Sequence, residues 1–418
     1  MTDSFNTIAT LNGNFKETYA DKLTSLIPEG FYLLKNIPFI KDAKQPGNYY
    51  HQPVVVGLEH GFTYLGPLGD AAVDLVGSIP GQVKDAQVQG YEFVLKSTMS
   101  VATASRAKNS KAAFEQSTKL LVSNMYRSFA RRLEVQLLHG QSNIGVVKAV
   151  TDGVTTTTVE IHDYAWAPGV FVGAEGMKVN FFSGSSLVSG ASADYKITAV
   201  DFTARKITVD SGDVYDHVVD TNTIWFAGSY GYEFAGIDKI GRNTSTLFNI
   251  DAGAYGLWKG TVLGNSGTQR DLTLEIIENG AAYAALKGAA DEKMVCIVSS
   301  LVWPTLLTEQ AAKRMYDSSF DGKAMMNGSK EIKFFSQVGE ITIVPSIYAK
   351  QGTCYILPME NLLRVGSSDI TFDQPGFEGQ FFRLIESKNA YELRAYADQA
   401  LFCEAPGKIV VIDDIAGA

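Results

Sequence analysis

The chain has 418 residues, of which 45% are apolar and 19% charged, and it carries 36 Lys and Arg against 45 Asp and Glu, for a formal net charge of −9. This is the composition of a globular protein long enough to bury a sizeable core and to form two or three domains. The acidic excess argues against general nucleic-acid binding through bulk electrostatics, although such a protein could line a space that holds DNA.

The cysteines and the N-terminal residues argue against a zinc protein, a secreted disulfide-rich protein and a membrane protein. Cys296, Cys354 and Cys403 are far apart in the sequence, and none belongs to a CxxC pair or lies beside a histidine. A zinc site therefore has little support, and the odd number argues against a secreted disulfide framework. The start, MTDSFNTIATLNGN, lacks the features of a signal peptide, and no run approaches the ~18 apolar residues of a membrane-spanning helix. We therefore expect a reducing compartment and no membrane segment.

Residues 1–45 are predicted to form an N-terminal arm. Residues 14–26 could form a short helix, which Pro28 and Gly30 would end. The run FYLLKNIPFI, at 31–40, is apolar and contains a proline. Because it has little means of burying this surface by itself, we expect it to pack against something else, namely the surface of a neighbouring copy.

Residues 46–104 are rich in Gly, Pro and β-forming residues, and they are predicted to form an extended β-hairpin loop. We assign its two limbs to VVVGLEHGFTYLGPLG and VQGYEFVLKSTMSVAT, with GSIPGQ as the loop between them. An isolated hairpin is poorly stable in water, so this one would need a partner surface.

Residues 105–145 contain the longest predicted element, an amphipathic helix over 111–139 that we expect Gly140 to stop through a left-handed cap. At about 1.5 Å per residue it would be a rod of roughly 45 Å. Its apolar stripe recurs every four residues and is joined by Phe114 upstream: Leu121, Met125, Phe129, Leu133 and Leu137. We expect a one-sided scaffold helix that packs against long strands around 381–402.

The sequence of residues 146–228 has the pattern of β-strands and contains no helical periodicity. Short β-branched or aromatic runs alternate with turn residues: TTTTVEI, MKVNFF, YKITAV, KITVD and NTIWFAG. This pattern predicts an inserted β-barrel or β-sandwich domain of roughly eighty residues. The neighbouring runs DYKITAVD and ARKITVDSG are a hairpin candidate.

Residues 229–418 mix both patterns, so the chain as a whole is predicted to be α+β. Residues 231–267 are loop-rich, and 272–287 predict a helix that Gly280 weakens. Pro304 suits the first turn of another helix, WPTLLTEQAAKRMYD. The predicted strands are MVCIVSS, EITIVPS, TCYILP, ITFDQP, FFRLI, YELRAYADQALF and KIVVIDDI.

No catalytic or phosphate-binding signature of the HExxH, GxSxG, GxGxxG or GxxxxGK[ST] type supports an enzyme. The main metal candidate is an acidic cluster in DSGDVYDHVVD, which a hard cation such as Ca²⁺ could use: Asp210, Asp213, Asp216, His217 and Asp220. A solvated acidic turn is the simpler interpretation. We predict no catalytic, cofactor-binding or metal site.

Other polar and aromatic residues have structural interpretations. The histidines lack a Ser or Cys partner at motif spacing, and His139 could favour the negative end of the helix dipole: His51, His60, His139, His162 and His217. Arg127, Arg131 and Arg132 could contact phosphates or an acidic neighbouring subunit. Pairing within the chain, for example with Glu134 or another nearby acid, is the favoured interpretation. The tryptophans are predicted core anchors: Trp166, Trp225, Trp258 and Trp303.

The order of these elements resembles the major capsid protein of tailed double-stranded DNA bacteriophages. Its fold is named after phage Hong Kong ninety-seven and is shared with herpesvirus capsid floors and encapsulins. STMSVATASRAKNSKAAFEQSTKLLVSNMYRSFARRLEVQLLHGQSNIG resembles the end of the family's extended loop and its spine helix, and LFNIDAGAYGLWKG resembles a segment that follows. GEITIVPSIYAKQGTCYILPMENLLRV is similar to the apical domain, and FFRLIESKNAYELRAYADQALFCEAPGKIVVI to the peripheral strands.

The resemblance implies a division into five parts: an N-terminal arm (1–45), an extended loop (46–104), the spine helix (105–145), an inserted β domain (146–228), and the apical domain with the peripheral strands (229–418). It also implies a structural protein that assembles as hexamers and pentamers into an icosahedral shell around double-stranded DNA. Such a protein would belong to the virion and assemble in the host cytoplasm. Its partners would be its own copies, with scaffolding, portal and decoration proteins, non-specific DNA contact at most, and no membrane.

Two other functions remain open. An encapsulin-like nanocompartment would enclose an enzyme in place of a genome. A soluble β-rich ligand-binding protein or hydrolase would use residues 146–228 as its binding module, but no paired carboxylates at useful spacing support it. Some relatives crosslink subunits through a loop Lys, a partner Asn and a buried acid. Lys84 and Lys96 lie in or beside the loop here, but no Asn or acid can be matched to the other roles.

Overall fold

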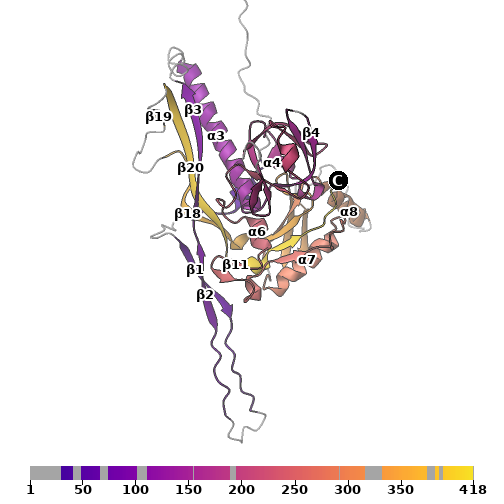
Figure 1. Ribbon diagram of the computed structural model, residues 1–418. Coiled ribbons are helices and arrows are strands. Elements are labelled where there is room, and N and C mark those ends of the chain that lie inside the picture. The colour runs from indigo at the N-terminus through magenta and orange to yellow at the C-terminus, as the bar shows by residue number, and fades with distance from the viewer. Residues whose placement is uncertain are drawn as a thin grey trace, which may run out of the picture.

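Figure 1 shows the computed structural model, in which a long helix and a long sheet project from a compact mixed body, and a narrow hairpin projects in another direction. The structure describes residues 30–40, 49–65, 74–100, 111–153, 155–188, 194–290, 292–315, 332–373, 382–385 and 389–417, with the backbone alone at 100, 111–120 and 310–315. The helix predicted at 14–26 lies outside the described residues, as does the side chain of Phe114.

The long helix, α3, spans Lys111–His139, as predicted. Its end differs in mechanism from the expected left-handed glycine. The residue with positive φ is Gln141, at 57°, and not Gly140. A Cβ on Gly140 would lie 2.3 Å from the carbonyl oxygen of Phe234, so glycine is needed there because another segment crosses at close range.

The stripe on α3 packs against two different partners. Met125 and Phe129 lie against the long strand β20 (Ala390–Cys403), as expected, and Phe129 stacks on Phe93 with ring centroids 4.3 Å apart. Leu133 and Leu137 instead belong to the main core of the molecule. The prediction of a one-sided helix is wrong for its last turns, because every residue from Leu133 to His139 is buried.

The peripheral sheet is built on β20. Strand β3 (Tyr91–Ser100) pairs antiparallel along one edge of β20, from Tyr91 opposite Gln399 to Ser100 opposite Ala390. Strands β18 (Leu362–Thr371) and β19 (Phe382–Leu384) pair antiparallel with β20 on its other edge. The predicted strand ITFDQP covers only the end of β18, most of which the sequence pattern does not indicate.

The hairpin pairing corrects the sequence prediction. Strand β1 (Tyr50–Gly57) pairs antiparallel with β2 (Gln82–Val88), and His60 bridges Ile79 further out. The segment taken as the second limb is mostly β3, which belongs to β20. The mistake arises because both β2 and β3 have strand character, and only contacts distant in sequence separate them.

The apical sheet has six strands in the order β13-β21-β17-β14-β16-β15, with two parallel pairs, β13–β21 and β14–β16. Their bounds are Thr261–Leu263, Val410–Ile412, Cys354–Pro358, Met294–Ser299, Gly339–Ser346 and Ile332–Ser336. Helices α7 (Leu274–Leu286) and α8 (Trp303–Met315) contribute to its core. The glycine inside α7 has a packing role. A Cβ at position 280 would lie 2.7 Å from the Ile356 side chain, so only glycine lets the helix approach the sheet this closely.

Residues 145–226 form a closed barrel. The strand order is β10-β4-β5-β9-β8-β6, β10 also pairs with β6, and β7 extends the sheet from β6. Their bounds, from β4 to β10, are Gly145–Asp152, Thr157–Ile161, Lys178–Ser183, Ser186–Val188, Tyr195–Asp201, Lys206–Val209 and Thr223–Phe226. The predicted β8–β9 hairpin is confirmed. The pairing of β10 with both β4 and β6 makes the fold a barrel and not a sandwich.

Short elements complete the described chain: α1 (Tyr32–Asn36), η2 (Asp163–Ala165), α4 (Pro168–Phe171), α5 (Val214–His217), α6 (Ile237–Gly241), β11 (Thr246–Leu247), β12 (Ile250–Asp251), η3 (Gly256–Trp258), η5 (Met359–Asn361) and η6 (Pro406–Lys408). Trp166, Trp225 and Trp258 are buried as predicted, and Trp303 is partly buried against the apical core. Among the residues that the structure describes, no helix is long and apolar enough to span a membrane.

Replacing Phe129 by Asp should prevent the subunit from folding and therefore from assembling. Loss of a buried Phe costs about 3–5 kcal/mol, and an unpaired buried carboxylate adds to that cost. Denaturant unfolding of the purified subunit measures the effect. The control is Tyr126→Asp, at a side chain that is 49% exposed on the same helix, which should change the unfolding free energy by about 0.5 kcal/mol or less. Wild-type stability of F129D would mean that the buried face is wrongly assigned.

Candidate functional site

The β1–β2 hairpin exposes an unusual amount of apolar surface. Its large apolar side chains lie on both limbs and are each more than half exposed: Val55, Leu58, Phe62, Tyr64, Leu65, Leu75, Val76, Ile79 and Val83. In Figure 1 the hairpin extends away from the body, so the rest of the described chain does not cover it. A concentration of exposed apolar side chains of this kind marks a surface that contacts another molecule.

The base of the hairpin is anchored to the segment that follows the barrel. Ala86 and Val88 are buried, and the Gln87 amide donates to the carbonyl of Phe248 at 3.0 Å. The Tyr255 hydroxyl donates to Gln82 at 2.7 Å. The stretch LFNIDAGAYGLWKG, singled out in the sequence, therefore supports the hairpin while the outer part projects.

The apolar arm segment 31–40 packs within its own chain. Leu33 and Ile37 enter the main core, and Phe31 stacks on Tyr348. Phe39 forms a parallel bridge with Arg364, whose amide donates to the Pro38 carbonyl at 2.9 Å. The expectation that the arm must lie on a neighbouring copy is therefore wrong for this run, which buries its apolar side chains in its own chain.

Two arginines of α3, Arg131 and Arg132, face the barrel. Arg131 donates through Nη2 to the carbonyls of Gly169 and Val170 in the barrel, at 2.8 and 3.2 Å. The Arg132 guanidinium lies 3.3 Å from the centroid of the Phe226 ring. Burial lowers the pKa of Arg132 to about 10 although Glu233 opposes that shift. These two side chains hold the barrel on α3. The interpretation that they interact within the chain therefore holds for both, with Glu233 as the acid near Arg132 in place of Glu134.

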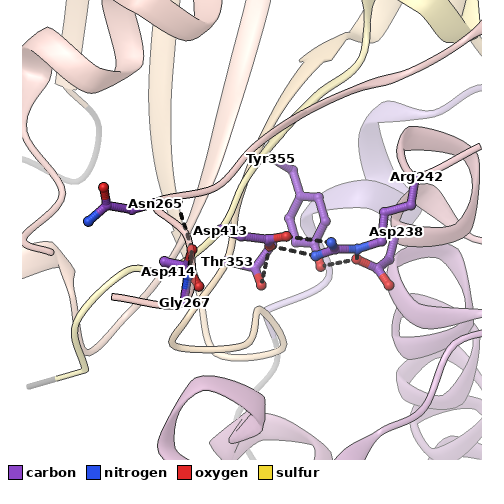
Figure 2. A network of polar contacts seen from close by, with 8 residues as sticks. All are labelled: Asp238, Arg242, Asn265, Gly267, Thr353, Tyr355, Asp413 and Asp414. Carbon is purple, nitrogen blue, oxygen red and sulfur yellow. Dashed lines mark hydrogen bonds and ion pairs between the residues drawn. The ribbon is translucent and has the colours of Figure 1, made fainter. Parts of the chain in front are cut away.

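A partly buried polar junction joins the apical sheet to α6, and Figure 2 shows it from close by. Arg242 donates to both carboxylate oxygens of Asp413, at 2.5 and 2.6 Å, and through Nε to Asp238 at 2.8 Å. The Tyr355 hydroxyl donates to Asp238 at 3.0 Å. One arginine therefore links a short helix, a central strand and the end of β21.

The junction extends on both sides of this core. Asp414 accepts from the amides of Asn265 and Gly267, at 2.6 and 3.0 Å, and has a positive φ of 60°. Lys350 donates to Asn143, which follows α3, at 3.1 Å. The acidic and basic side chains surround a cavity of about 430 Å³ that Tyr164 and Val146 of the barrel also line. The barrel, the spine helix and the apical sheet thus meet at one polar site.

The charges of the junction compensate one another. Burial alone would raise the pKa of Asp238, but Lys350 and Arg242 outweigh it and hold that pKa well below its usual range. Burial likewise opposes the charge of Arg242, yet its bonds to Asp413 raise its pKa. Burial also lowers the pKa of Lys350. Two carboxylates facing two cations form a structural ion-pair network.

His139 is buried and neutral. Its Nε2 donates to the Tyr348 carbonyl at 2.8 Å, and burial, together with Lys350, lowers its pKa to about 3. The suggestion that it acts as a cation at the helix dipole is therefore wrong. Two other histidines pair with acids, His51 with Asp85 at 2.7 Å and His162 with Asp220 at 2.9 Å.

The acidic cluster at 210–220 does not converge. Asp210 accepts from the Lys196 amide, Asp220 pairs with His162, and His217 lies 3.4 Å from Asp213. Within the described ranges, no three His, Cys, Asp or Glu side chains are grouped to hold a metal ion. The arrangement favours the simpler interpretation of an acidic turn.

The remaining candidates have clear places in the fold. Lys96 on β3 pairs with Glu392 on β20 at 2.8 Å, and Lys84 on β2 lies over the Tyr255 ring. Cys296 and Cys354, far apart in sequence, have Sγ atoms 3.1 Å apart on neighbouring strands. Burial raises the pKa of Cys354 well above its ordinary value, which keeps the thiol protonated.

Neither a protein-family model nor a curated protein sequence matches the chain. Solved structures do match over nearly its whole length, and they define the class of fold as that of phage capsid proteins. A chain from the cyanophage A-1(L) capsid asymmetric unit is 12% identical, with a TM-score of 0.59 over 98% of this chain and 99% of its own. A chain from the capsid of a native GTA particle is 11% identical, with a TM-score of 0.51 over 99% and 100%.

The expectation of an α+β capsid fold is confirmed by these matches, which at such low identity concern the fold alone. A chain of the encapsulin complex from Synechococcus elongatus is 8% identical, with a TM-score of 0.43 over 99% of this chain and 96% of its own.

Removal of the central cation should destabilise the junction strongly. Arg242→Met leaves Asp238 and Asp413 without their shared partner. Because the Arg242 side chain is 35% and that of Asp413 23% exposed, the expected cost lies between the roughly 1 kcal/mol of a surface pair and the roughly 3–5 kcal/mol of a fully buried one. Denaturant unfolding at neutral pH measures this loss. Lys148→Met provides the control, because it removes an exposed partner of Glu160, and such surface pairs contribute at most about 1 kcal/mol. Equal effects of both substitutions would contradict a central structural role for Arg242.

Proposed function

We propose that this chain is the structural shell protein of a virus, and that its hexamers and pentamers tile an icosahedral shell around double-stranded DNA. The observation that carries the proposal is the capsid fold over the whole chain. The projecting hairpin supports it, because its exposed apolar side chains need the surface of another copy. A protein of this kind requires repeated, geometrically defined contacts and no catalytic group.

The charge of the chain is compatible with this role. A net charge of −9 disfavours tight binding to DNA, so the inner surface would contact a packaged genome only non-specifically. We propose localisation in the virion, with assembly in the host cytoplasm. Scaffolding, portal and decoration proteins are the further partners that such a shell would use.

We also propose a division of labour along the chain. Within residues 46–104 the β1–β2 hairpin would reach neighbouring subunits, whereas 31–40 of the arm and β3 stay within the subunit. Residues 105–145 would form the spine. The inserted domain at 146–228 would add contacts between capsomers, help the monomer fold, or decorate the exterior. Residues 229–418 would supply the apical domain and the peripheral strands. The partly buried junction around Arg242 supports this division, because it holds three of these parts together without using the hairpin.

Expression of the full chain, alone and with a scaffolding protein, tests the proposal directly. Size-exclusion chromatography and electron microscopy should reveal closed shells. A persistent small monomer under all conditions would contradict the proposal. The alternative of an encapsulin-like compartment is distinguished by content, because such a shell would hold an enzyme where a viral shell holds DNA.

Polar replacement of the hairpin side chains should block assembly without unfolding the subunit. Phe62 is 72% and Tyr64 91% exposed, so the double variant Phe62→Ser, Tyr64→Ser removes few contacts within the chain. We expect an unfolding free energy within about 0.5 kcal/mol of wild type and a loss of most shells by electron microscopy. The matched control is Tyr215→Ser, at an exposed aromatic on the barrel, and it should assemble. Normal shells from the double variant would show that the hairpin is not an assembly contact.

A further inference from the structure

Two of the three cysteines form a close pair inside the apical sheet. The Sγ atoms of Cys296 and Cys354 lie 3.1 Å apart, although the two residues are 58 positions apart in the sequence. Cys296 is on β14 and lies opposite Ile356 of β17, and Cys354 is two positions from Ile356 on the same strand. Since side chains alternate between the two faces of a strand, both thiols lie on one face of the sheet, in the apical core.

The pair lies at the centre of the sheet and is sealed from solvent. Both side chains are 0% exposed. Strands β14 and β17 are the middle two of six, with β16 and β15 on one side and β21 and β13 on the other. A covalent bond between the two sulfur atoms would therefore join the two halves of the sheet at the boundary that they share.

The third cysteine is equally buried but lies elsewhere. Cys403 ends β20 and packs in the main core, whereas the pair packs in the apical core. Burial raises the pKa of Cys403 to about 12 and raises that of Cys354 well above its ordinary value. Because a protonated thiol is a weak nucleophile, both thiols should react slowly with any reagent. What distinguishes Cys354 from Cys403 is therefore the second sulfur beside it.

We propose that Cys296 and Cys354 form a disulfide bond when the folded protein meets a small oxidant of the peroxide class, and that this bond ties the two halves of the apical sheet together. In a reducing compartment the pair remains as two thiols. An S–S bond is about 2.05 Å long, so its closure brings the two sulfur atoms closer by about 1 Å. Rotation of the two side chains supplies a movement of this size.

Hydrogen peroxide completes the reaction without another reactant. It is small and uncharged, so it reaches the thiols through local openings of the sheet. One sulfur loses its proton and attacks the O–O bond, which gives a sulfenic acid and one water. The second sulfur then attacks the sulfenic sulfur, so that the S–S bond forms, the S–O bond breaks and a second water leaves. The two thiols lose two electrons and two protons, and one peroxide is reduced to two waters.

The bond should stabilise the subunit mainly by constraining the unfolded chain. It closes a loop between residues 58 positions apart, and a loop of this length predicts a rise of about 5 °C in the midpoint of thermal unfolding. A shell released from a reducing cell would gain this stability once it meets an oxidant. That last step rests on the proposed function, whereas formation of the disulfide does not, so the two can fail separately.

Counting thiols by mass spectrometry tests the bond on the purified full chain. The folded protein is treated with hydrogen peroxide, which catalase then removes, and is unfolded in denaturant with N-ethylmaleimide. We expect one alkylated thiol, at Cys403, and all three cysteines alkylated when dithiothreitol is added first. Peptide mapping should recover a fragment that joins Cys296 to Cys354. Three alkylated thiols after peroxide, a bond to Cys403, a bond between two chains, or oxidation of the pair that dithiothreitol does not reverse would overturn the proposal.

Substitutions separate the disulfide from other effects of peroxide, such as the oxidation of methionine. Cys354→Ala removes one sulfur of the pair, so peroxide should leave its unfolding midpoint without the rise. The matched control, Cys403→Ala, keeps the pair and should show the full rise of about 5 °C, which dithiothreitol should reverse. The thiol count on the wild-type chain decides the matter if either variant does not fold. A peroxide-dependent rise in C354A equal to that of wild type would show that another group is responsible.

Discussion

The structure depends on the burial of the last turns of α3 on all sides. Each part of the molecule attaches to α3 at or just before these turns, through a different contact. The peripheral strands stack on Phe129 through Phe93, the barrel accepts hydrogen bonds from Arg131, and the apical loop accepts one from His139. Since a helix buried on every face cannot send its polar side chains to water, each must find a partner, and those partners determine where the other parts lie.

This arrangement separates the rigid part of the subunit from the parts that remain uncovered. The apical sheet, the barrel and α3 meet at the Arg242 junction, where the charges compensate within the chain. The β1–β2 hairpin is anchored only at its base, and its outer apolar side chains have no cover among the described residues of the chain. A well-connected body with one uncovered apolar limb is physically suited to assembly with copies of itself.

Local patterns predict much of this fold. The limits of α3, the buried strand β14 and the β8–β9 hairpin follow from periodicity and turn residues. Local patterns do not predict which distant strands pair. By composition β2 and β3 are equally good partners for β1, but β3 pairs with β20, and β2 is left to pair with β1. The junction was missed because α6 lies in a loop-rich stretch, although the i,i+4 spacing of Asp238 and Arg242 is a usable signal.

The sequence by itself determined the α+β class, the long helix, the β character of the insertion and the absence of a catalytic signature, because these depend on residues close together in the chain. The tertiary structure alone decided what the polar side chains do. By sequence Glu134 is a candidate partner of a nearby arginine, but in the structure it accepts from amides about a hundred positions away. His139 is a neutral donor to the Tyr348 carbonyl. Burial sets both outcomes, and burial is produced by segments that no local pattern brings together.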